Sequence, residues 1–249
     1  MADNKVDALF IGAHPDDIEI CAGGTIVKLV KEGKKVGIID CTPGEMGTRG
    51  SVAERRKEAE KAAEILGVHY RENLGMRDGY IRYSDENMLR LITTLRKYQP
   101  EMIITHPPFE RHTDHEQLNK LVREANFKAG LIKIETKLDG KLQERWRTRK
   151  LYYYMQSFEF PRKPDFYVDI SEVYDIKVKA LEAFETQIYF EGKSDIKKGH
   201  QTRLYRPGFM KEKEARAIYF GSLIGVQYAE AFLSEEPVGI SSLSNFLDY

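Results

Sequence analysis

An imidazole and two carboxylates stand together after the first apolar run of the chain. The run Val6–Ile11 is short, mostly apolar and followed by Gly12, which predicts a central strand of a parallel sheet. His14, Asp16 and Asp17 come next, at the carboxyl end of that strand, where open α/β sheets bind ligands. Imidazole and carboxylate groups bind metals, and a spare carboxylate beside a metal can act as a base. Helix capping by the two aspartates is the alternative, but two acids and a histidine exceed what capping needs.

A second cluster follows the strand predicted over Glu101–His106. His112 and His115 lie three residues apart at the start of the next predicted helix, so both imidazoles can face one crevice. Asp114 can accept a hydrogen bond from one of the rings, or stand as an anion at the helix entrance. Taken singly, either histidine could equally be a surface residue near the start of a helix. Four of the six histidines fall at the ends of these two strands, however, which favours a shared site.

The two clusters together offer a set of metal ligands. Two histidines and one carboxylate with open positions suit a hydrolytic Zn²⁺ site, and also non-haem Fe²⁺. We predict His14, Asp17 and His115 as the ligands. The spacing alone does not separate the roles of Asp16 and Asp17.

Strand and helix patterns alternate through the first half of the chain. Ser51 and Glu54 form a capping-box pattern before a helix, and Gly67 is placed to end it. This alternation with short connections predicts an α/β fold, a mostly parallel sheet with helices on both faces. The predicted strands are Val36–Asp40, Val68–Arg71 and Glu101–His106, and the predicted helices are Ala53–Leu66 and Asp85–Tyr98.

The second half is less regular, and we interpret the whole chain, residues 1–249, as a single domain. Irregular excursions are expected near 131–150 and 190–209. Ser171 is expected to cap a long amphipathic helix that reaches Phe184. Glycines at 221 and 225 interrupt the last predicted helix, and a close backbone approach or packing against a partner is the expected reason for them. The remaining predictions are strands at Leu151–Met155 and Phe166–Ile170, and a last helix over Met210–Leu233.

The composition excludes several classes of protein. The 39 lysines and arginines balance the 39 aspartates and glutamates, so no overall field attracts nucleic acid or an anionic membrane. The polar start Met1–Lys5 lacks a signal-peptide core, and no segment approaches the length of a membrane span. Cys21 and Cys41 have no metal-binding spacing and are expected as reduced thiols. We therefore expect a cytoplasmic protein with a small-molecule substrate and no nucleic-acid or membrane partner.

The two clusters resemble the signatures of the LmbE-like (PIG-L type) metal-dependent deacetylases, which remove acetyl groups from N-acetylglucosamine units. That family carries the motifs AHPDD and HxDH, and both stand in this chain at the clusters described above. The resemblance implies a Rossmann-like fold, a homo-oligomer and one divalent metal ion, Zn²⁺ or alternatively Fe²⁺. It implies His14, Asp17 and His115 as ligands, Asp16 as the general base, and His112 as the electrophilic or acid partner.

Further segments resemble the deacetylases of bacillithiol biosynthesis, which act on N-acetylglucosaminyl malate. They are the loop 44–50, the run 55–59, the strand 166–170 and the stretch 219–225, so this resemblance spans nearly the whole chain. The two carboxylates of malate call for forked donors, which favours arginine over lysine. The candidate substrate contacts are therefore Arg55, Arg111 and Arg49, with Glu45 and Tyr219 in addition.

Two other functions stay open at this stage, and a third is disfavoured. The same chemistry can serve another N-acetylglucosaminyl conjugate, with an inositol, an oligosaccharide or an antibiotic precursor. A non-catalytic metal-binding protein of the same fold is the second alternative, although the predicted ligands and the base Asp16 are all present. Dinucleotide binding is disfavoured, because the chain has Gly12-Ala13-His14-Pro15-Asp16 where a G-x-G-x-x-G motif is needed.

Overall fold

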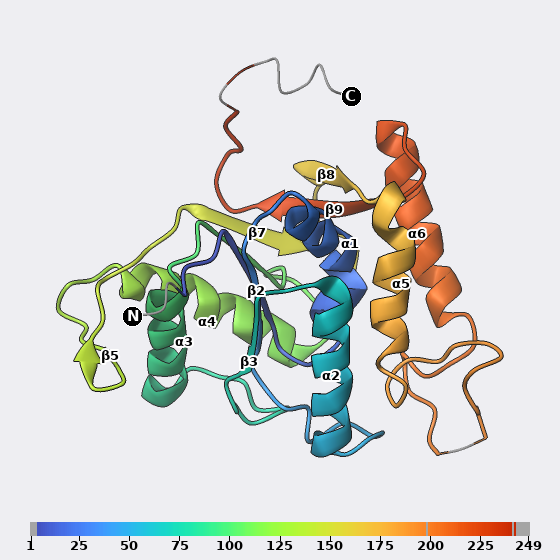
Figure 1. Cartoon of the computed structure of the whole chain (residues 1–249), viewed down its shortest axis with the longest axis horizontal. Helices are drawn as coiled ribbons and strands as arrows, with labels where there is room; N and C mark the ends of the chain where they lie inside the picture. The colour runs from blue at the N-terminus through green and yellow to red at the C-terminus, as the bar shows by residue number, and fades with distance from the viewer. Residues whose placement is uncertain (1–3, 198, 241, 243–249) are drawn as a thin grey trace.

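A seven-stranded sheet forms the centre of the protein (Figure 1). The computed structural model describes residues 4–197, 199–240 and 242. The strand order is β3-β2-β1-β4-β7-β9-β8; the first five strands run parallel, and β9 runs antiparallel to both neighbours. The predicted mostly parallel α/β sheet is thereby confirmed. The strands are β1 Ala8–Gly12, β2 Val36–Asp40, β3 Tyr70–Asn73, β4 Met102–Thr105, β7 Lys150–Tyr154, β8 Phe166–Asp169 and β9 Ala229–Ser234.

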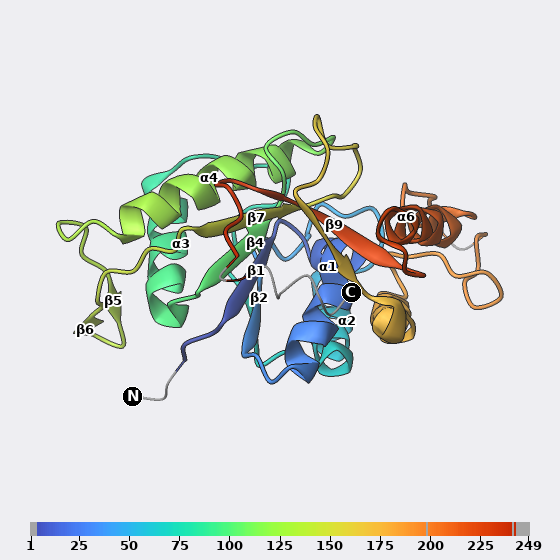
Figure 2. The same ribbon diagram turned by 90° about the horizontal axis from the view of Figure 1, so that it is seen from above.

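Helices cover both faces of the sheet (Figure 2). Helices α1, α2 and α5 lie on one face and α3 and α4 on the other, while α6 packs beside β9 and β8. Side chains of β1 alternate between two cores: Ala8 and Phe10 enter one, and Leu9 and Ile11 enter the other. The helices are α1 Asp17–Lys31, α2 Val52–Leu66, α3 Asp85–Tyr98, α4 Thr113–Ala129, α5 Tyr174–Glu182 and α6 Phe209–Ile224.

Local signals account for several of these boundaries. The capping box at the start of α2 is present, with Ser51 and Glu54 bonding to each other's backbone. Gly67 ends α2 at φ 73°. Strand β3 begins two residues later than predicted, at Tyr70. Within 131–150, β5 (Lys137–Leu138) and β6 (Lys141–Leu142) form a small hairpin.

The prediction of one helix over 210–233 is wrong. Helix α6 ends at Ile224, and β9 follows after a short turn and inserts between β7 and β8. Gly225 allows the turn because it adopts φ 77°, which ends the helix in a left-handed conformation. A Cβ at Gly221 would lie 2.6 Å from the carbonyl oxygen of Val226, so the close backbone approach named as a reason for these glycines is present.

The predicted capping by Ser171 is also wrong. Ser171 begins a single 3₁₀ turn, Ser171–Val173, and its hydroxyl donates to Asp169 Oδ1. This local bond competes with a helix cap, as is common for serine. Helix α5 begins at Tyr174, after this turn, and has no side-chain cap at its start. Among the described residues, no helix combines the length and apolar character needed to cross a membrane.

Candidate active site

The carboxyl ends of β1 and β4 bring three predicted ligands together. His14 Nδ1 lies 3.3 Å from Asp17 Oδ2. His115 Nε2 lies 3.3 Å from the same oxygen and 3.4 Å from His14 Nδ1. Strands β1 and β4 are neighbours in the sheet, so the loop after β1 and the start of α4 meet at one edge. All three side chains are buried.

This triangle of atoms has the size that one metal ion requires. Ligand atoms at about 2.1 Å from a tetrahedral Zn²⁺ lie roughly 3.4 Å apart, close to the three distances above. Two imidazole nitrogens and a carboxylate oxygen are also the right donors for such an ion. A second triple, His14 with His112 and Asp114, lies within 4.8 Å as well. The first triple fits a metal better, because its three side chains are all buried whereas His112 of the second is only half-buried, and because its atoms have the spacing given above.

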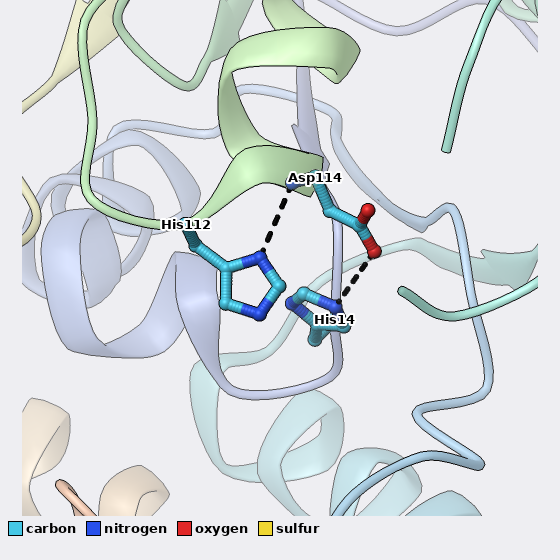
Figure 3. Close-up of side chains that lie close together, drawn as sticks. All are labelled: His14, His112 and Asp114. Atoms are coloured by element: carbon cyan, nitrogen blue, oxygen red, sulfur yellow. Dashed lines mark hydrogen bonds and ion pairs between the residues drawn. The ribbon is translucent and has the colours of Figure 1, made fainter. Parts of the chain in front are cut away.

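Two carboxylates stand behind the ring of His14. Its Nε2 lies 2.8 Å from Asp78 Oδ1 and 3.5 Å from Asp114 Oδ2, a contact visible in Figure 3. Asp114 is held in turn by the backbone N–H groups of Gly79 and Ile81. A carboxylate on the far nitrogen of a ligating histidine fixes its tautomer and orientation. Asp114 therefore lies where the sequence predicted an acceptor for a ring, and Asp78 shares this position.

Asp16 lies beside the triangle with an uncommon backbone conformation. Its φ is 111°, a region that L residues rarely adopt and that concentrates at functional sites. It precedes α1 but makes no side-chain cap bond, so capping does not account for it. Burial raises the pKa of its carboxyl to about 8, although the guanidinium of Arg55 lowers it. A carboxyl with such a pKa can both accept and return a proton near neutral pH.

The guanidinium of Arg55 is occupied by the protein itself. It donates to the carbonyl oxygens of Gly44 and Pro15, at 2.9 Å each, and its Nη2 lies 3.5 Å from Asp16 Oδ2. Arg55 thus fastens the loop after β2 to the loop that carries Asp16. Contact between Arg55 and a substrate carboxylate stays a prediction.

His112 stands at the N-cap position of α4. Its Nδ1 accepts the backbone N–H of Asp114 at 3.2 Å (Figure 3), so Nε2 carries the proton of the neutral ring. Burial lowers its pKa, and the nearby rings of His115 and His14 lower it further. This shift favours the neutral ring, whose Nε2 offers an N–H donor.

His106 packs against the ligand His115 in the protein interior. It is fully buried, its Nε2 accepts the backbone N–H of Ala13 at 3.0 Å, and its ring stacks on His115 at 3.9 Å. Burial lowers the pKa of His115 to about 4, which keeps its Nε2 available as a ligand. Burial raises the pKa of the Asp17 carboxyl, but the adjoining imidazoles of His115 and His106 outweigh burial and hold that pKa well below the usual range.

A cavity of about 410 Å³ opens over the cluster, within the range of small-ligand sites. Part of its wall comes from the excursion near 190–209, through Thr202, Arg203 and Leu204. Arg55 and Arg111, two of the predicted substrate contacts, line this cavity. The exposed guanidinium of Arg111 has no hydrogen-bond partner within the described part of the chain.

The other three predicted substrate contacts lie outside this cavity. Arg49 donates to the carbonyl oxygens of Thr186 and His200 and borders a larger space of about 1090 Å³, which contains none of the histidine–aspartate cluster. Glu45 accepts the backbone N–H of Asp78. Tyr219 is 59% exposed on α6. Glu45 is linked to the cluster through Asp78, which lies against His14, whereas Arg49 and Tyr219 do not line the cavity.

Two residues of the site escaped the sequence analysis. Asp78 lies in a turn-rich loop with no local signal. Gln156 lines the cavity and donates from Nε2 to Asp17 Oδ1. It directly follows the predicted strand 151–155, so its position at a strand end was a usable signal.

Known proteins share this sequence and architecture. The model of the family described as GlcNAc-PI de-N-acetylase, PIG-L, matches residues 9–126. The diacetylchitobiose deacetylase of Thermococcus kodakarensis is 33% identical, over 89% of this chain and 80% of that protein. A probable N-acetyl-alpha-D-glucosaminyl L-malate deacetylase 2 of Bacillus anthracis is 30% identical over 49% of this chain and 60% of its own length.

A solved structure extends the likeness to nearly the whole chain. The crystal structure of a conserved protein from Thermus thermophilus superposes with a TM-score of 0.81 at 33% identity, and covers 96% of this chain and 98% of that one. The similarity to the Thermococcus protein and to this structure extends well beyond residues 9–126, the segment that the family model matches. These two proteins therefore share the second half of the fold as well. The chain belongs to the PIG-L family of N-acetylglucosaminyl deacetylases.

Proposed function

We propose that this protein hydrolyses the N-acetyl group of an N-acetylglucosaminyl conjugate with one divalent metal ion held by His14, Asp17 and His115. The observation that carries the proposal is the buried Asp16 carboxyl, which lines the same cavity as the three ligand residues. A binding protein has no need of a strained, buried acid at this position. When bound, the metal ion supplies a Lewis acid that polarises a carbonyl and lowers the pKa of water.

Two side chains of the protein move or hold protons in this reaction. Asp16 accepts a proton as a water oxygen bonds to the acetamide carbon, and it returns that proton to the nitrogen as the carbon–nitrogen bond breaks. Acetate and a free amine are the products. The Nε2–H of His112 donates to the carbonyl oxygen as negative charge develops there, a contact worth roughly 3–4 kcal/mol.

We assign Zn²⁺ as the metal, with Fe²⁺ as the alternative. The distances between the three ligand atoms support a tetrahedral arrangement, which zinc prefers. The same donor set also suits non-haem iron. Metal content of protein purified without added metal, together with activity after reloading with each ion, decides between them.

For the substrate, we assign N-acetylglucosaminyl malate. The cavity is lined by the cationic side chains of Arg111, Arg203 and Lys213, in addition to Arg55, which is paired with Asp16. Such a wall favours an aglycone with carboxylates over a neutral sugar. The malate deacetylase among the relatives supports this choice, and the chitobiose deacetylase supports an oligosaccharide as the second candidate.

A side-by-side assay of acetate release tests both levels of the proposal. The amides are N-acetylglucosaminyl malate, di-N-acetylchitobiose, N-acetylglucosaminyl inositol and N-acetylglucosamine itself. We expect the highest kcat/KM with the malate conjugate. Equal or faster cleavage of chitobiose would overturn the malate assignment alone, whereas no acetate from any of the four would overturn deacetylation.

A further inference from the structure

We infer that Gln156 is a positioning residue for Asp17, an inference that rests on the metal site proposed above. Gln156 lies in the loop after β7, 139 residues from Asp17 along the chain, and donates from Nε2 to Asp17 Oδ1. Both side chains are buried. Gln156 lies outside residues 9–126, so the segment matched by the family model does not contain it.

The two oxygens of Asp17 have different partners. Oδ2 accepts the backbone N–H of His14 at 2.9 Å and faces the ligand nitrogens of His14 and His115, at 3.3 Å each. Oδ1 takes the hydrogen bond from Gln156. With Oδ1 engaged in this way, the carboxylate presents Oδ2 alone to a metal ion, and the remaining coordination positions stay open for water and substrate.

The geometry of Gln156 has a cost that a purely structural residue would avoid. Its Oε1 is buried and has no hydrogen-bond partner among the described residues. A buried acceptor without a partner destabilises the fold, and a leucine of similar size would not carry that cost. The hydrogen bond from Nε2 to Asp17 is what the glutamine adds in return.

Helix α6 and the loop before α4 hold Gln156 in place. The carbonyl oxygen of Gln156 accepts hydrogen bonds from Lys213 and Arg216 of α6. The next backbone N–H, that of Ser157, donates to the buried carboxylate of Glu110 at 2.8 Å. The peptide between these residues is thus fastened from two sides, which orients the amide of Gln156 toward Asp17.

Cobalt binding tests this role without relying on turnover. Gln156→Leu removes the donor and the unpartnered acceptor together, and Gln156→Ala serves as a second variant. Gln143→Leu is the matched control, because Gln143 also donates one hydrogen bond, to the Thr93 carbonyl oxygen, and also has a buried Oε1 without a partner among the described residues. We measure the Co²⁺ dissociation constant by chelator competition, the visible spectrum of the Co²⁺ protein, and thermal unfolding without metal.

We expect Gln156→Leu to fold, because the loss of the donor to Asp17 Oδ1 is offset by the loss of the unpartnered Oε1, yet to bind Co²⁺ about 10–100-fold more weakly. The visible Co²⁺ bands should lose intensity, because a carboxylate free to bind through both oxygens raises the coordination number. Gln143→Leu should match the wild type in affinity and spectrum. Unchanged affinity and spectrum in both Gln156 variants would overturn the positioning role alone. A wild-type protein that binds no Co²⁺ would overturn the metal site and this role with it.

Discussion

Arg55 Nη2 lies 3.5 Å from Asp16 Oδ2, and both side chains are buried in the same wall of the cavity. The pair joins α2 to the loop after β1. Among the described contacts, Arg55 supplies the only guanidinium that reaches Asp16, the carboxyl that we propose as the base. Fold stability and proton transfer therefore depend on neighbouring atoms, and substitutions can separate the two.

Asp16→Asn removes the proposed base and leaves the metal ligands in place. We expect full metal content and a fall in kcat of roughly 10²–10⁴-fold, since an amide cannot accept the proton of water. Acetate release and elemental analysis of the same sample measure the two quantities. An undiminished rate would show that Asp16 is not the base.

Arg55→Ala breaks a buried ion pair and leaves the carbonyl oxygens of Gly44 and Pro15 without their donor. We expect the free energy of unfolding to fall by about 3–5 kcal/mol in urea titrations. Arg56→Ala is the matched control, because Arg56 is exposed on the same helix and its effect should stay within about 0.5 kcal/mol. Equal stability of the two variants would contradict the role assigned to Arg55.

Arg111→Ala tests the malate assignment at a residue whose guanidinium lines the cavity. The loss of a forked donor to a carboxylate should raise KM for the malate conjugate about 10-fold or more. The kinetics with N-acetylglucosamine, which carries no carboxylate, should not change. A similar increase in KM for both compounds would place Arg111 at the sugar and not at the aglycone.

Removal of the metal should abolish activity and lower stability. A ligand that binds only the folded state stabilises it by RT ln(1 + [L]/Kd), about 4 kcal/mol at a thousandfold excess over Kd. Thermal unfolding before and after chelation measures this difference, and Zn²⁺ should restore both stability and acetate release. His115→Ala lacks a ligand, so its unfolding temperature should be nearly the same with and without Zn²⁺.

Gly221 and Gly225 test the turn between α6 and β9. Gly221→Ala should destabilise the protein by about 1–3 kcal/mol, because the new Cβ meets the carbonyl oxygens of Val226 and Gln227 at 2.6 and 2.7 Å. Gly225→Ala meets no atom within 4 Å but must adopt φ 77°, so about 1 kcal/mol is expected. A larger loss of stability at Gly225 than at Gly221 would show that the left-handed turn, and not the close backbone approach, is the stronger constraint.

The sequence by itself determined the features that depend on neighbours along the chain. The bounds of α3, the capping box at Ser51 and Glu54, and the buried central strand β1 follow from local periodicity, hydrogen bonding and apolar runs. The two motifs that carry His14 and His115 were equally visible. Parallel strands place such strand ends at one edge of the sheet, and the structure brings both motifs together there.

Only the tertiary structure decided what reaches that edge from elsewhere. The sequence predicts a helix where β9 forms. Strand β9 lies between β7 and β8 and is buried on both faces, so its sequence lacks the alternation of polar and apolar residues that indicates a half-exposed strand. Asp78 and Gln156 join His14 and Asp17 across 64 and 139 residues. No spacing rule spans such distances, since the contacts depend on how the sheet orders its strands and where the loops close.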